Sequence, residues 1–155
     1  MPDREVVAGR HPFHPALVHF PIACWGLSHP ADLAALVGIE ILFFGLDWWA
    51  ISSLLIWTGV VSAIPAMVVG IYDFMQLPDQ DSLMQAFYKH ISFVGTAWIL
   101  YLASGYTRLE DNLVLASPML LPALISGTGL LCLCIGGWYG GQMVYRYYLG
   151  TNPGE

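Results

Sequence analysis

Charged side chains are scarce in this chain of 155 residues: Asp, Glu, Lys and Arg make up 10 %, while 57 % of the residues are hydrophobic. A soluble domain carries about 25 % charged residues, because its surface must be hydrated. The mean hydropathy of +0.62 agrees with this shortage. The composition therefore predicts an integral membrane protein and argues against a soluble catalytic module.

Cysteines are also few, and none belongs to a recognisable cofactor motif. Cys24, Cys132 and Cys134 lie in apolar sequence, and no C-x-x-C-H motif for covalent haem attachment is present. They are interpreted as small packing residues rather than as a disulfide framework. The sequence shows no nucleophile paired with a base and a third positioned group, so a hydrolytic enzyme is the least favoured class. The net charge of −6 argues against nucleic acid as a partner.

Four windows of the sequence are almost free of charge, namely residues 16–39, 48–72, 86–106 and 118–145. At 1.5 Å per residue, each is long enough to cross a hydrocarbon core about 30 Å thick. The connecting segments are short. The sequence therefore predicts an all-α integral membrane protein with one domain over residues 1–155, folded as an up-and-down bundle of four transmembrane helices.

An even number of spans places both termini on the same side of the membrane. That side holds Arg4, Arg10, Lys89 and Arg146, whereas the opposite side holds only Arg108. By the positive-inside rule, both termini are predicted to lie on the cytoplasmic side.

The up-and-down topology gathers ionisable residues at one end of the bundle. Ionisable groups inside a membrane are costly and are functional candidates by default. The residues expected at that end are His11, His14, His19, Asp73, His90 and Arg146.

The histidines favour a haem site. On a continuous helix at about 100° per residue, His14 and His19 would point about 140° apart, so one ligand from the first span is expected. His19 and His90 each lie about one turn inside the membrane, at matched depth. Two imidazoles from facing helices are typical axial ligands of a b-type haem. We therefore predict His19 and His90 as the metal ligands.

Other residues near this end fit the same site, and each has a simpler alternative. Gly140 and Gly141 would leave room for a flat cofactor, or serve only close helix packing. Arg146 and His14 would bind propionates, although Arg146 also suits a membrane anchor and His14 a position among lipid headgroups, as does His11. Asp73 would orient a ligand histidine, or lie solvated beyond the second span.

His29 and Asp32 lie deeper, about 15 Å from His19 by helical rise. Three positions apart on one helix, they predict an imidazole–carboxylate pair if the helix continues through Pro30, and this pair either has a structural or proton-relaying role or simply lies close to the far interface. No other histidine is available at that depth for a second bis-histidine site.

Several motifs resemble a bacterial membrane family known only as a domain of unknown function (DUF2231). They are HPFHPALVHFPIACW, GIYDFMQLP and GGWYGGQMVYR. The positions typical of the family fall on His11, His14, His19, Asp32, Asp73, His90, Gly140, Gly141, Tyr145 and Arg146. Members often continue the last motif with His-Gly, where this chain has Tyr147 and Tyr148. The resemblance implies four helices in a bacterial cytoplasmic (inner) membrane but no activity, and some relatives are joined to haem-carrying domains.

Three functional classes follow from these observations. The first is a membrane subunit that binds haem b and transfers electrons beside other redox subunits or a second copy of the chain, with lipid around it and a quinone as a further partner. The second is a non-redox accessory or scaffold subunit, with a chlorophyll-type pigment or no cofactor. The third is a metal or proton transporter. An electron-transfer or accessory role is favoured over an enzymatic one.

Overall fold

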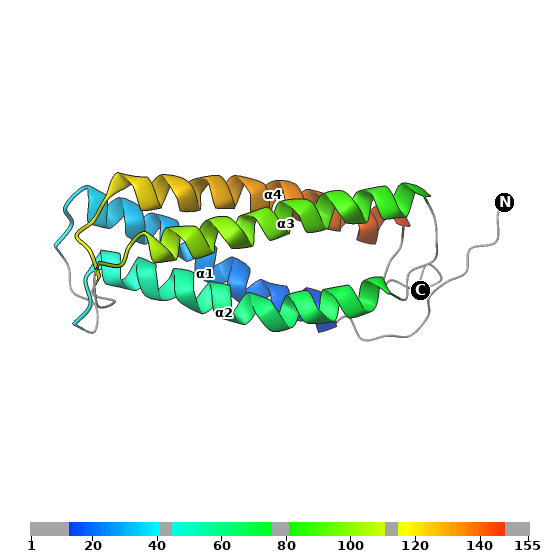
Figure 1. Cartoon of the computed structure of the whole chain (residues 1–155), viewed down its shortest axis with the longest axis horizontal. Coiled ribbons are helices and arrows are strands. Elements are labelled where there is room, and N and C mark those ends of the chain that lie inside the picture. The colour runs from blue at the N-terminus through cyan, green and yellow to red at the C-terminus, as the bar shows by residue number, and fades with distance from the viewer. Residues whose placement is uncertain (1–12, 41–44, 76–80, 111–114, 148–155) are drawn as a thin grey trace.

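The chain, seen in a computed structural model that describes residues 13–40, 45–75, 81–110 and 115–147, forms four long α-helices in the described part. They are α1 (Phe13–Leu36), α2 (Trp48–Phe74), α3 (Asp81–Tyr106) and α4 (Leu120–Tyr147). The helices run up and down in turn, so the start of α1 and the end of α4 share one end of the bundle (Figure 1). The all-α architecture expected from the sequence is confirmed. His11 lies outside the described residues.

The turn between α1 and α2 shows why these helices end where they do. Gly38 adopts a φ of 76°, a conformation that glycine adopts without steric cost. The amides of Gly38 and Ile39 bond back to the carbonyls of Ala35 and Ala34, at 3.2 and 2.9 Å, which is the Schellman pattern that closes a helix. Asp47 then caps α2, since its carboxylate accepts the Ala50 amide hydrogen at 2.7 Å.

The four helices form two hairpins. α1 packs closely along α2, and α3 along α4, whereas contacts between the two pairs are much fewer. In the half of the bundle where α1 begins, Figure 1 shows the α3–α4 pair above the α1–α2 pair, with space between the ribbons.

Each helix turns one seam of residues inward. Along α1 these positions alternate by four and three residues, which is the spacing of a packed helical bundle. In chain order the α1 seam consists of His14, Val18, Pro21, Trp25, Ser28 and Asp32, all buried or half-buried.

An aromatic cluster fills the middle of the bundle. The rings of Trp25 and Tyr101 stack with centroids 4.4 Å apart and planes 1° apart, and both side chains are buried with Ile56 and Val60 around them. Gly59 makes this possible, since a Cβ there would lie 2.4 Å from Nε1 of Trp25. The core therefore depends on close approach of a helix backbone to an indole ring.

A buried ion pair joins the helices at the end of the bundle opposite the start of α1. The guanidinium of Arg108, 0 % exposed, donates to both carboxylate oxygens of Asp32, 3 % exposed, at 2.7 and 2.8 Å. Ser52 donates to the same carboxylate, and the Arg108 guanidinium lies 4.2 Å from the Trp49 ring centroid. Arg108 is thus a buried structural group in the described fold and not a free loop cation.

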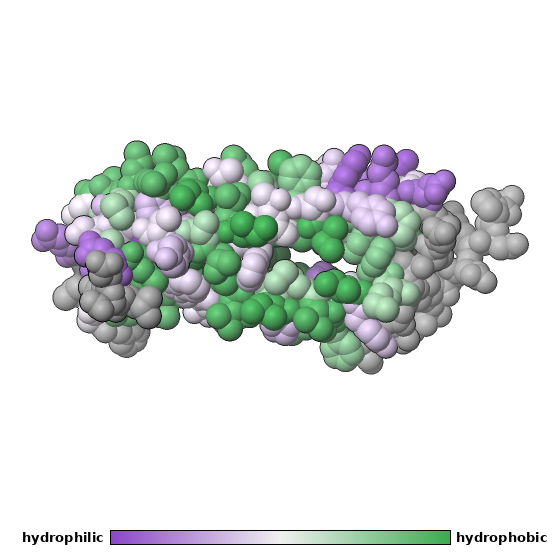
Figure 2. All heavy atoms as spheres, viewed as in Figure 1, coloured by the Kyte–Doolittle hydropathy of each residue, from purple (hydrophilic) through white to green (hydrophobic). Residues whose placement is uncertain are grey.

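Two of the four described helices, α2 and α4, are long and apolar enough to cross a membrane. The sequence predicted four such segments, and the structure supports this length and hydropathy for two of them. Three histidines and Asp32 lower the hydropathy of α1, and polar residues along an exposed stripe lower that of α3. That stripe consists of Gln85, Lys89, Ser92 and Thr96. Much of the outer surface is nevertheless apolar, with hydrophilic residues gathered toward the two ends (Figure 2).

Candidate functional site

His14 begins the candidate site in the first turn of α1. Its side chain is half-buried, and its Nδ1 lies 2.8 Å from the backbone carbonyl oxygen of Ala66 on α2. A carbonyl can only accept, so Nδ1 donates its hydrogen and the lone pair of the neutral ring is on Nε2. Gly70, one turn further along α2, gives the ring its space, because a Cβ there would lie 2.8 Å from ring atoms of His14.

His90 on α3 has the same surroundings. It is half-buried, and its Nδ1 lies 2.8 Å from the carbonyl oxygen of Gly136 on α4. Gly140, again one turn further along, leaves room for the ring, since a Cβ there would lie 3.1 Å from Nδ1 of His90. Each histidine is therefore held in one tautomer by the second helix of its own hairpin.

The two rings meet across the space between the hairpins. Their centroids are 6.5 Å apart and their planes make an angle of 87°. A metal ion bound at about 2.0 Å by an imidazole nitrogen lies about 3 Å from the ring centroid, so two imidazoles on opposite sides of one ion have centroids about 6 Å apart. The centroid spacing of His14 and His90 is therefore close to the spacing that one ion between two imidazoles would give.

The two histidines are the whole of the metal-ligating set that the described residues bring together here. No group of three or more His, Cys, Asp or Glu side chains converges anywhere in the described part of the chain. A structural zinc site needs about four protein ligands. Haem iron needs only two axial ligands, because the porphyrin supplies the other four nitrogens. Figure 2 shows an opening between the two hairpins in the half of the bundle where α1 begins.

His19, expected from the sequence to be the α1 ligand, has a different position. Its side chain is exposed, and its Nδ1 contacts the carbonyl oxygen of Pro15 one turn earlier on the same helix. α1 is continuous from Phe13, so His14 and His19 point in different directions, as the helical period requires. The structure brings His14 rather than His19 beside His90.

The other expected site residues are divided between the site and its rim. Gly140 lines the His90 ring, whereas a Cβ on Gly141 would meet only Tyr145, at 3.9 Å. Arg146 is exposed in the last turn of α4. The carboxylate of Asp73 makes no histidine contact among the described residues, and backbone carbonyls orient both rings instead.

His29 and Asp32 do not bond to each other. Nε2 of His29 lies 3.0 Å from the hydroxyl of Tyr101 on α3, and Asp32 binds Arg108. α1 continues through Pro30, but the two side chains contact different neighbours. Arg108 lies beyond the third apolar window of the sequence, which indicates a loop charge and gives no sign that it pairs with Asp32.

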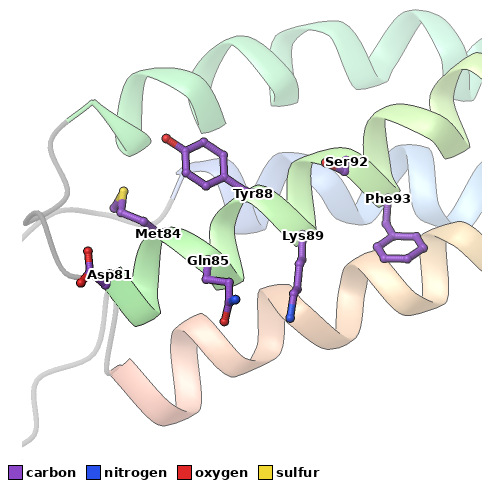
Figure 3. Close-up of a pocket in the computed structure, with 7 residues that line it drawn as sticks. All are labelled: Asp81, Met84, Gln85, Tyr88, Lys89, Ser92 and Phe93. Carbon is purple, nitrogen blue, oxygen red and sulfur yellow. The ribbon is translucent and has the colours of Figure 1, made fainter.

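A shallow groove lies apart from the histidines, on the outer face of α3. Its lining comes from α3 between Asp81 and Phe93, with Gln85, Lys89 and Phe93 directed toward α4 (Figure 3). The ammonium of Lys89 lies 5.4 Å from the centroid of the Tyr139 ring. Within the described residues, the groove therefore contains no cluster of metal-ligating side chains.

Comparison with known proteins gives one match. Residues 10–153 match the family described as "Predicted membrane protein (DUF2231)". No curated protein and no solved structure matches the chain.

Proposed function

The chain belongs to the DUF2231 family of predicted membrane proteins, and we propose that it is a membrane subunit that binds one b-type haem between His14 and His90 for electron transfer. The observation that carries this proposal is the pair of rings with centroids 6.5 Å apart, each fixed through Nδ1. His14 replaces His19 as the ligand from α1, because His19 is exposed. A haem held there supplies a one-electron couple between ferric and ferrous iron.

The protein's own groups prepare the two ligands. The Nδ1 hydrogen bonds to Ala66 and Gly136 set the ring orientations and make Nε2 a better electron donor. Gly70 and Gly140 leave the rings room to lie against the helix backbones. The surrounding apolar helices limit access of water, which is one of the means by which a protein tunes a haem potential.

All four helices are included in the proposed membrane domain. α1 and α3, with 24 and 26 residues, match a hydrocarbon core about 30 Å thick, and they pack against α2 and α4. The proposed location is a bacterial inner membrane with the termini on the cytoplasmic side. The proposed partners are other redox subunits or a second copy, lipid, and a quinone.

The first experiment is the absorption spectrum of the detergent-solubilised protein, oxidised and dithionite-reduced. We expect a stoichiometric Soret band and a sharp reduced α band, both lost in His14→Ala and in His90→Ala. His19→Ala is the matched control, because it removes an exposed histidine of the same helix, and it should keep the spectrum. A band that survives His14→Ala and disappears in His19→Ala would refute the ligand assignment.

A colourless wild-type protein that remains folded would refute haem binding altogether. It would favour an accessory subunit or a transporter. A long-wavelength absorption in place of the haem bands would identify a chlorophyll-type pigment.

The angle between the rings gives a second, independent measurement. If His14 and His90 held one haem iron, ring planes near a right angle would leave two iron d orbitals nearly equal in energy, which would move the ferric low-spin electron paramagnetic resonance signal to lower field than parallel planes would. With planes 87° apart, we expect that low-field signal from the oxidised protein. A rhombic signal typical of parallel ligand planes would contradict the geometry.

A further inference from the structure

The two hairpins repeat one pattern of inward-facing residues. His14 and His90 are 76 positions apart (90 minus 14), and so are Trp25 and Tyr101. Ser28 and Ser104, both 0 % exposed, follow the same offset. For the second helices the offset is 70. It relates the buried or half-buried pairs Ser52 and Pro122, Ile56 and Ser126, Gly59 and Gly129, Ala66 and Gly136, and Gly70 and Gly140.

The contacts repeat together with the positions. Gly59 receives the ring of Trp25, and its counterpart Gly129 receives the ring of Tyr101, where a Cβ would lie 3.2 Å from the nearest ring atom. The carbonyl and glycine that hold His14 correspond in the same way to those that hold His90. The offsets differ by six residues because equivalent positions are 56 residues apart in the first hairpin (70 minus 14) and 50 residues apart in the second (140 minus 90).

Three residues of the first hairpin contact their own counterparts. The ring of His14 faces His90, Trp25 stacks on Tyr101, and Asp32 binds Arg108, 76 positions further on. Where a two-fold axis relates two copies, a residue on the axis contacts its own equivalent in the other copy, as at the centre of a symmetric dimer. The three contacts succeed one another along α1 and along α3 with the two residues that follow it, so this axis runs along the bundle.

We infer that the chain consists of two equivalent helical hairpins joined in tandem, and that the face between them is an interface at which Asp32 and Arg108 permit only the mixed pairing. This inference stands independently of any cofactor, since it rests on contacts of the protein alone.

The charges of Asp32 and Arg108 explain why only the mixed pairing of hairpins is permitted. If two α1–α2 hairpins associated in this geometry, Asp32 would face a second Asp32, and two α3–α4 hairpins would place Arg108 against Arg108. A buried charge without an opposite partner is strongly destabilising. The other two contacts on the axis join similar groups, histidine with histidine and tryptophan with tyrosine. Only the contact between Asp32 and Arg108 therefore distinguishes the mixed pairing from a pairing of two identical hairpins. Repulsion between like charges confers specificity in this way.

The surroundings of the ion pair would accommodate its reversal. Arg108 lies near the hydroxyl of Ser104, four residues earlier, and an arginine at position 32 would have the buried Ser28 at the same spacing. Ser52 contacts both charged side chains, since it donates to Asp32 and accepts from Arg108. The contact between Arg108 and the Trp49 ring has no equivalent, because position 119 is methionine.

The test is a charge exchange in the full-length chain. Asp32→Arg and Arg108→Asp each create a like-charge pair, and the double variant Asp32→Arg with Arg108→Asp restores opposite charges in reversed order. The readouts are the yield of monodisperse protein in mild detergent and its apparent Tm. Both can be measured on protein without haem, so a colourless but folded protein would refute the proposed function and leave this inference intact.

We expect each single variant to lower the folded yield about tenfold or more, and the exchange to restore it to within about threefold of the wild type. A double variant as poor as the single variants would overturn the inference, because equivalent positions must tolerate the exchange. A second exchange, Trp25→Tyr with Tyr101→Trp, avoids buried charge. It should fold with a Tm somewhat below that of the wild type, because the exchange removes the hydrogen bond between Tyr101 and His29, and aggregation of this variant would count against equivalent halves.

Discussion

Alanine substitution of the glycines beside the two histidines should weaken cofactor binding in a graded order. A Cβ at Gly70 would lie 2.8 Å from ring atoms of His14, and one at Gly140 would lie 3.1 Å from His90. Ordinary contacts begin near 3.4 Å. The His14 ring must therefore retreat by 3.4 minus 2.8, or 0.6 Å, and the His90 ring by 0.3 Å. Gly137→Ala is the matched control, since nothing lies within 4 Å of a Cβ there.

The size of the effect follows from overpacking. An extra methyl group in a well-packed site costs about 1–3 kcal/mol, which corresponds to about 5- to 150-fold in affinity. We place Gly70→Ala toward the upper end of this range and Gly140→Ala toward the lower end. The helices themselves should survive, because alanine in a helix interior is favoured over glycine by about 1 kcal/mol.

The assay is haem titration of the detergent-solubilised apoprotein, followed by the Soret absorbance, with circular dichroism to verify that each variant is helical. The expected order of affinity is wild type and Gly137→Ala together, then Gly140→Ala, then Gly70→Ala. Equal affinity for Gly70→Ala and Gly137→Ala would refute the reasoning. It would mean that the ring of His14 does not hold the position required of a ligand.

Three further predictions concern stability, measured by unfolding in detergent. Gly59→Ala places a methyl group 2.4 Å from the indole nitrogen packed on it and should cost about 1–3 kcal/mol; Gly127→Ala, in open space, should not, and equal melting of the two would contradict this. Arg108→Leu leaves Asp32 buried without its partner and should cost about 3–5 kcal/mol of stability. The double variant Arg108→Leu with Asp32→Leu should recover most of that loss. If it does not, the ion pair stabilises the fold by more than its burial costs. Asp47→Ala removes a helix cap and should cost about 1 kcal/mol, while Asp47→Asn should be neutral, and an equal loss in both would assign the effect to charge instead.

The helices could be predicted from the sequence because their limits depend on local chemistry. Charge-free windows end where acids, prolines and glycines begin, and the predicted limits 48–72 and 118–145 lie within two residues of α2 and α4 at each end. The start of α3 was less predictable. Its first turn contains Asp81 and was excluded as charged, although an acid there is favourable to a helix N-terminus.

The histidine pair could be predicted only in part. The depth of His90 follows from its position in the sequence, and the helical period showed that His14 and His19 cannot both face one partner. Which of the two faces inward depends on the rotation of α1, and this is set by contacts with α2 such as that of His14 with Ala66. Packing between segments 52 residues apart leaves no local signal.

Arg108 shows the same limit. Its position beyond the third apolar window suggested a loop cation, yet α3 ends at Tyr106 and the arginine side chain is fully buried. A comparison of the chain with itself would have given a clue. At the offset that aligns His14 with His90, Asp32 aligns with Arg108, and opposite charges at equivalent inward positions indicate a pair.

The two ends of the pseudo-symmetric axis differ in whether their polar groups already satisfy one another. At one end, Asp32 and Arg108 neutralise each other, and Ser52 and Ser104 bond to them. That arrangement is complete within the protein, which suits a structural role. At the other end, each histidine uses Nδ1 on a carbonyl of its own hairpin, so the lone pair of each ring is on Nε2. Two neutral acceptors cannot bond to each other. A ligand that accepts electron pairs from both sides would complete this end, and it would at the same time join the two hairpins, which contact each other less than the helices within each hairpin do.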